Sequence, residues 1–234
     1  MTISADRQII YPDSDGQPMA DNTKQFRWIV LLKENLECLF AADPQVFVAG
    51  DLLWYPVEGH PEIRVAPDAM VVLGRPKGDR GSYRQWEESD IAPQVVFEVL
   101  SPGNRLTEMA KKLQFYDRYG VEEYYLYDPD RNDLSGFQRL EGKLTVLDDM
   151  TDWVSPRLGI RFVLMPDDLL IYYPDGQRFL TTVELTQQML QEKQRAEQEK
   201  QRAEQEKQRA EQEAARADRL AAQLRALGVD PDGV

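Results

Sequence analysis

Apolar positions in the first 184 residues follow a helical spacing in some segments and form continuous strand-like runs in others. Residues 24–41 repeat apolar side chains every three or four positions, which predicts an amphipathic helix. A second helical spacing over 106–120 ends at Gly120. Apolar runs predict strands at 46–55, 63–73, 94–100 and 123–129, and small strands at 134–140, 143–147 and 160–165. This order predicts a mixed α/β (α+β) fold, a restriction-endonuclease-like sandwich around one central mixed sheet.

The C-terminal segment has a different pattern. Residues 192–212 are three copies of EKQRAEQ, and the pattern decays before Gly228. These residue types favour a long charged helix that ends at Gly228, with ion pairs such as Glu199–Arg202 and Lys193–Glu197. We therefore expect two parts, a domain at 1–184 and a charged helix or coiled coil at 185–234.

The heptad spacing of this helix leaves two interpretations open. The apolar seam has alanine at one core position and glutamate at the other, as in Ala196 with Glu199 and Ala203 with Glu206. Such a seam buries little, which favours a single solvated helix. Met189, Leu220 and Leu224 extend the seam at its ends and favour a weak coiled coil, hence a possible homodimer.

Charge and cysteine content restrict the classes of partner and compartment. The net charge is −13, and residues 1–184 hold 19 basic and 31 acidic side chains, so a DNA-binding surface must be local or depend on metal ions. The single cysteine, Cys38, excludes an intramolecular disulfide and favours the cytoplasm. The first ten residues show no secretory signal, and no run approaches the roughly 20 apolar residues of a membrane span, so we expect no membrane partner.

Two acids interrupt apolar strands. Glu98 lies within the run 95–100, and Asp68 lies within the run 65–72. A buried carboxylate is costly unless it is paired or bound to a metal ion. Each acid alone fits a salt bridge or a strand-end hydrogen bond, whereas the two together favour an oxygen-ligand site for Mg²⁺ or Mn²⁺.

Lys112 is the candidate partner of these acids. It lies at the edge of the apolar stripe of the 106–120 helix, with Glu108 and Tyr116 one turn away on either side. A lysine beside metal-bound carboxylates orients a water molecule or stabilises developing negative charge. The alternative is a surface lysine whose stem covers the core. A single histidine and a single cysteine exclude the usual Cys/His zinc sites, so we expect carboxylate chemistry.

Three segments together resemble a known family. They are APDAMVV at 66–72, VVFEVLSPGN at 95–104, and a Lys-x₃-Tyr-x₃-GVEEYYLYDP stretch at 112–129. Their order is similar to that of the Uma-type restriction endonuclease family, and the chain resembles a cyanobacterial-like member of this family. This family belongs to the PD-(D/E)XK nuclease superfamily, and the resemblance runs from about residue 20 to 184.

The resemblance implies a Mg²⁺- or Mn²⁺-dependent endonuclease that hydrolyses DNA. It implies that Asp68, Glu98 and the carbonyl of Val99 hold the metal and that Lys112 is catalytic, with Glu108 and Tyr116 in support. Leu100 stands where the superfamily usually has its lysine, which maps that role to Lys112. The family's N-terminal acid and histidine segment has no counterpart, because the only histidine is His60; Glu34 or Glu37 is an alternative source of the extra acid.

The loop between the two acid-bearing strands is the candidate DNA contact. It combines cations with aromatic residues, namely Arg75, Lys77, Arg80 and Arg84 with Tyr83 and Trp86. Such residues suit backbone contact and base stacking, although neighbouring acids such as Glu88 fit a plain exposed loop equally well. The alternative function is a catalytically silent scaffold that keeps the nuclease fold and assembles through its C-terminal helix.

Overall fold

The computed structural model describes residues 9–14, 16 and 18–226. The chain divides into two compact units, Met1–Leu180 and Thr181–Val234. The boundary expected after residue 184 remains a prediction. The helix stop expected at Gly228, and residues 1–8 of the segment in which we expect no secretory signal, lie outside the described residues.

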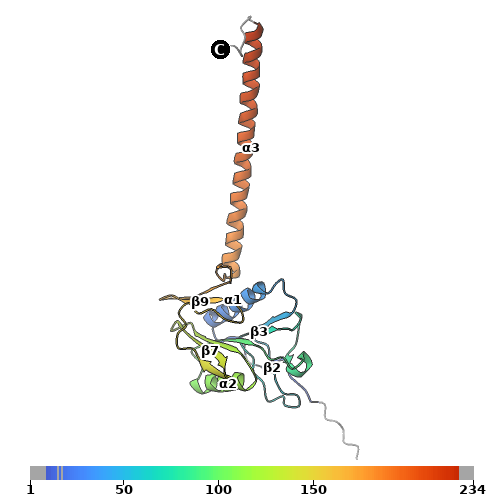
Figure 1. The fold of residues 1–234 in the computed structure, drawn as a ribbon, viewed down its shortest axis with the longest axis vertical. Coiled ribbons are helices and arrows are strands. Elements are labelled where there is room, and N and C mark those ends of the chain that lie inside the picture. Colours follow the sequence, from blue (N-terminus) through green and yellow to red (C-terminus); the bar gives the residue numbers. More distant parts are fainter. Residues whose placement is uncertain (1–8, 15, 17, 227–234) are drawn as a thin grey trace, which may run out of the picture. The chain divides into compact units, whose positions relative to one another are not determined.

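The first unit is built on a six-stranded mixed sheet (Figure 1). β5 and β6 run parallel, and the other neighbouring strands of this sheet are antiparallel. Across the sheet the strands are β1 (Val46–Ala49), β3 (Ala69–Leu73), β5 (Val95–Val99), β6 (Glu123–Asp128), β7 (Asp133–Leu140) and β8 (Lys143–Val146). The predicted mixed α/β fold with a central mixed sheet and a long C-terminal helix is confirmed.

Two helices cover opposite faces of this sheet (Figure 1). α1 (Thr23–Leu39) packs Trp28 and neighbouring apolar residues against the face that bears Phe97. α2 (Leu106–Arg118) packs Tyr116 against the other face, which bears Val96. Because side chains alternate along a strand, Glu98 shares the α2 face with Val96.

Two small sheets and a short 3₁₀ helix complete the first unit. β9 (Arg161–Leu164) pairs with β10 (Leu169–Tyr172), and their Phe162 and Ile171 join the core on the α1 face. β2 (Trp54–Tyr55) pairs with β4 (Tyr83–Arg84), which is followed by the 3₁₀ helix Gln85–Glu88.

Two predicted strands are shorter than expected. The run 46–55 is divided into β1 and β2, because Asp51 has a φ of 48°, which a continuous strand does not allow. The run 63–73 forms a strand only from Ala69 onward. Pro67, which lacks an N–H group for the sheet, immediately precedes Asp68 and delays the start.

The second unit contains the helix α3 (Thr182–Ala226), and none of its described residues is buried. Its start is a capping box: Thr181 Oγ1 accepts from the N–H of Glu184 (3.2 Å), and the Glu184 carboxylate accepts from the N–H of Thr181 (2.9 Å). The pairs Glu199–Arg202 and Lys193–Glu197, which the spacing allows, stay a prediction. Exposed ion pairs gain little in water, and Gln201 and Gln208 donate to glutamates four residues earlier. Among the described helices, none is both long and apolar enough to cross a membrane.

Candidate active site

The two predicted carboxylates lie side by side on adjacent strands. Ala69 on β3 pairs with Phe97 on β5 in antiparallel register, and one step further places Asp68 opposite Glu98. The backbone N–H of Val99 donates to Asp68 Oδ2 at 2.6 Å. Asp68 and Glu98 are only 8% and 3% exposed. The fold therefore brings together two acids that are 30 residues apart in the sequence and buries both of them.

Helix α2 supplies the partners of Glu98. Lys112 Nζ lies 2.7 Å from Glu98 Oε2, and the Tyr116 hydroxyl donates to Glu98 Oε1. Burial alone would lower the pKa of Lys112, but the negative charge and hydrogen bond of Glu98 outweigh it and the pKa is raised. Burial, with the charge of Glu98, raises the pKa of Tyr116 well above its usual value. Both groups are therefore protonated donors to Glu98 at neutral pH.

Asp68 is the less compensated of the two acids. Burial raises its pKa well above the ordinary value, and the charge of Glu98 raises it further. Lys112 and the N–H of Val99 oppose this effect without cancelling it. One lysine thus faces two buried carboxyl groups, an imbalance that a bound cation would relieve.

The carbonyl of Val99 is held by a residue that sequence reasoning missed. Gln25 Nε2 on α1 donates to this carbonyl at 2.8 Å, across 74 positions of sequence. The sequence feature that could have indicated Gln25 is the N-cap of α1, where Asn22 accepts from the N–H of Gln25 at 2.9 Å. That cap fixes the first turn of α1 and with it the position of the Gln25 side chain at the end of β5.

The other candidates for an extra N-terminal acid lie in surface ion pairs. Glu34 pairs with Lys33 at 3.0 Å, and Glu37 pairs with Lys77 at 3.3 Å. His60 is exposed and lies 3.0 Å from Glu62. No contact joins these residues to Asp68 or Glu98 in the part of the chain that the structure describes.

The donor set fits a hard divalent cation. Asp68, Glu98 and the Val99 carbonyl offer only oxygen atoms, which Mg²⁺ and Mn²⁺ prefer. Within residues 9–14, 16 and 18–226, no group of three or more His, Cys, Asp or Glu side chains is placed to hold a metal ion. Two carboxylates and a carbonyl nevertheless suffice for Mg²⁺, because this ion keeps several water ligands.

The remaining predicted site residues lie apart from this pair. Glu108 is exposed on α2 and affects Lys112 through its charge, which contributes to the raised pKa of Lys112. The four cations of the predicted DNA-binding loop each face an acid. Arg75 and Arg80 both bind Glu88 (2.8 and 2.7 Å), Lys77 binds Glu37 and Arg84 binds Glu87. Their role in DNA binding stays a prediction, since phosphate contact would compete with these pairs.

A hollow of about 570 Å³ lies where β5 ends and α2 begins, and Asp68, Glu98 and Lys112 are not among its lining residues. Its lining includes Leu126, which is the register partner of Glu98 on β6, and Met109, which lies one turn before Lys112 on α2. Arg105, at the start of α2, also lines it; this side chain is exposed and has no ion pair among the described residues. The hollow is therefore lined by neighbours of Glu98 and Lys112 and not by the pair itself.

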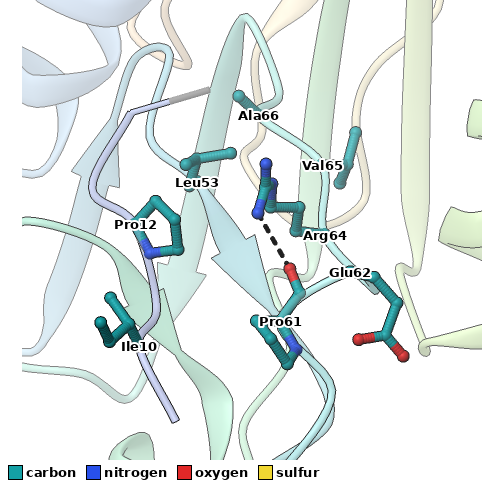
Figure 2. A pocket seen from close by; sticks show the side chains of 8 residues that line it. All are labelled: Ile10, Pro12, Leu53, Pro61, Glu62, Arg64, Val65 and Ala66. Carbon is teal, nitrogen blue, oxygen red and sulfur yellow. Dashed lines mark hydrogen bonds between the residues drawn. The ribbon is translucent and has the colours of Figure 1, made fainter. Parts of the chain in front are cut away.

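A second hollow, of about 730 Å³, lies along the segment that leads to Asp68. Figure 2 shows Ile10 and Pro12 on one side of it, with Arg64 facing them and donating to the carbonyl of Pro61 at 3.0 Å. Asp68, Glu98 and Lys112 are not part of its lining. The first hollow is the better candidate for a substrate, because its lining includes Leu126, the register partner of Glu98, and Met109, one turn before Lys112.

Comparison with known proteins identifies the family. The family model Uma2, described as "putative restriction endonuclease", matches residues 14–166, which is well over half of the chain. The chain belongs to the Uma2 family. Among solved structures, it is similar to a protein from Anabaena variabilis described as a "putative nuclease belonging to DUF820", with 17% identity and a TM-score of 0.43. That match covers 60% of this chain and 74% of the other, and comparison with curated proteins gives no match.

Proposed function

We propose that this Uma2-family protein is a Mg²⁺-dependent endonuclease that hydrolyses DNA phosphodiester bonds. The observation that carries the proposal is the meeting of Asp68 and Glu98 on adjacent strands, with Lys112 bound to Glu98 at 2.7 Å. Two buried acids, one lysine and an all-oxygen donor set suit metal-assisted hydrolysis of a phosphodiester. The exposed Cys38, the only cysteine, fits a reducing compartment, and we place the activity in the cytoplasm.

The residues of the site divide the work by position. Asp68, Glu98 and the Val99 carbonyl would hold Mg²⁺ or Mn²⁺, which supplies Lewis acidity and an activated water when bound. Tyr116 fixes the Glu98 carboxylate, and Gln25 fixes the Val99 carbonyl. Lys112, protonated at neutral pH, donates to the attacking water or to the phosphate oxygens as negative charge develops.

Arg105 is the best-placed cation for a DNA phosphate. It lines the hollow at the start of α2, two turns before Lys112, and, among the described residues, has no carboxylate partner. The four loop cations, in contrast, are already paired with acids. An acidic protein with few free cations would depend on the metal ion for much of its attraction to the DNA backbone.

The test is calorimetric titration of Mn²⁺ into the wild type and Glu98→Ala, with a plasmid-nicking assay in parallel. We expect the wild type to bind Mn²⁺ and nick the plasmid, and Glu98→Ala to lose both, because one of two carboxylate ligands is gone. Glu62→Ala is the matched control, since it removes an exposed acid whose ion pair, within the described part of the chain, is with His60. A wild type that binds no metal and cuts nothing would refute the nuclease and leave a scaffold acting through α3 as the working model.

A further inference from the structure

Tyr124 carries a buried hydroxyl group without a hydrogen-bond partner. The residue is 1% exposed, and its hydroxyl is one of two buried side-chain polar atoms that lack a partner among the described residues. A buried hydroxyl without a hydrogen-bond partner destabilises the fold, because it has lost its bonds to water. Two other buried tyrosines meet this need, because Tyr116 donates to Glu98 and Tyr125 donates to Glu123. The unsatisfied group at Tyr124 therefore requires an explanation.

The hydroxyl lies next to the predicted active site. Tyr124 on β6 pairs with Val96 on β5, two residues before Glu98 on the same face of the sheet. Its ring is 5.0 Å from that of Tyr116, whose hydroxyl is bound to Glu98. Burial raises the pKa of Tyr124, and the charges of Glu98 and then Asp68 raise it further. The hydroxyl therefore keeps its proton and is a donor without a partner on the face of the sheet that bears Glu98.

We propose that Tyr124 is a positioning residue of the site, whose hydroxyl donates a hydrogen bond to Glu98 when Lys112 no longer occupies that carboxylate. This inference rests on the proposed function and adds a residue to it. Both oxygens of Glu98 now have partners, Lys112 on one and Tyr116 on the other.

Asp68 and Glu98 would hold a divalent cation, whose charge would disfavour the ammonium group of Lys112 at Glu98. The Tyr124 hydroxyl then donates to Glu98 in place of Lys112, and because it is neutral the cation does not repel it. Lys112 becomes available for the water or the phosphate. The unsatisfied hydroxyl thus lowers the stability of the ion-paired arrangement and stabilises the cation-bound one.

The first test compares Tyr124→Phe with the matched control Tyr125→Phe in the full chain, by Mn²⁺ calorimetry and by urea unfolding in EDTA. Tyr124→Phe should weaken Mn²⁺ binding about ten- to hundredfold, the effect of losing one hydrogen bond to a charged group, without lowering the unfolding midpoint. Tyr125→Phe should leave Mn²⁺ binding unchanged and lower the unfolding midpoint. Its hydroxyl donates to Glu123 at 2.9 Å and accepts from Trp153 at 3.1 Å, on the opposite face of the sheet.

The second test needs no metal. In a Lys112→Met background the ammonium is gone from Glu98, so Tyr124 should gain Glu98 as a partner, and adding Tyr124→Phe should lower the unfolding midpoint. In the wild-type background the same change should not lower it. Such non-additivity in a double-mutant cycle reports a direct coupling.

The outcomes separate the two proposals. If the wild type binds Mn²⁺ and Tyr124→Phe binds it equally well, the role of Tyr124 is wrong and the nuclease stands. If the wild type binds no Mn²⁺, the nuclease fails, and the cycle in EDTA still decides whether Tyr124 couples to Glu98. Additive effects of Lys112→Met and Tyr124→Phe would overturn the inference.

Discussion

Asp68 is a buried carboxyl group whose neighbour across the sheet is a second carboxyl group, Glu98. An amide at this position would still accept the hydrogen bond from the N–H of Val99, without a charge to bury. We therefore predict that Asp68→Asn abolishes Mn²⁺ binding and nicking but raises the free energy of unfolding at pH 8. The gain should be about 1.4 kcal/mol for each unit by which the pKa is raised, measured by urea unfolding in EDTA.

The direction of the pH effect follows from the raised pKa of Asp68. Burial, with the charge of Glu98, makes the folded chain hold this proton to a higher pH than the unfolded chain does. The stabilising effect is full below the ordinary pKa of 3.8 and is lost as pH rises through the folded pKa. The advantage of Asp68→Asn over the wild type should therefore grow between pH 5 and pH 8. An advantage that shrinks over this range would contradict the assignment.

Single residues of the site differ in how far the sequence reveals them. Asp68 and Glu98 stand out because each acid interrupts an apolar run, and the helical spacing places Lys112 toward the sheet. Gln25 and Tyr124 give no such signal, since a glutamine in a helix and a tyrosine in a strand are ordinary. Their significance depends on partners that are distant in sequence, 74 positions away for Gln25 and Val99.

At the scale of elements, the loop between β3 and β5 is organised by one carboxylate. Glu88 binds both Arg75 and Arg80, and its side chain is only 14% exposed. Burial raises the pKa of Glu88, but the two arginines outweigh it and the pKa is lowered overall. The loop therefore uses two of its four cations for its own structure.

We predict that Glu88→Ala lowers the free energy of unfolding by about 1–3 kcal/mol, because it leaves two partly buried arginines without an acceptor. Glu87→Ala is the matched control. Its side chain is 56% exposed and lies 3.4 Å from Arg84, and it should change stability by less than about 0.5 kcal/mol. Urea unfolding at pH 7 measures both. Equal effects would mean that the Glu88 clamp does not hold the loop.

The sequence predicts elements well where one pattern continues and poorly where geometry interrupts it. The helices at 24–41 and 106–120 are observed as α1 and α2, since a helical spacing needs only local bonds. The break of 46–55 at Asp51 depends on a backbone angle that no apolar pattern encodes. β4 has two residues and β10 has four, too short for a period to be recognised.

At the scale of the whole molecule, the open question is whether α3 joins two copies of the chain. In a heptad with Ala196 and Ala203 at one core position and Glu199 at the other, the flanking positions are Lys200 and Arg202. In a parallel pair of helices, lysines such as Lys200 would face arginines such as Arg202 of the other copy. In an antiparallel pair, lysine would face lysine and arginine would face arginine. The seam therefore offers little apolar burial together with charge repulsion.

We predict that the full chain is a monomer and that α3, about 68 Å long at 1.5 Å per residue, is a single helix. The chain ending at residue 184 and the full chain should both sediment with the mass of one copy at micromolar concentration. The strongest alternative is a dimer in which the exposed Leu220 and Leu224 pair the ends of two helices. A dimer of the full chain only, abolished by Leu220→Lys with Leu224→Lys, would locate the interface there. In that case the two active sites of a dimer would be tethered through α3, an arrangement suited to cutting both DNA strands.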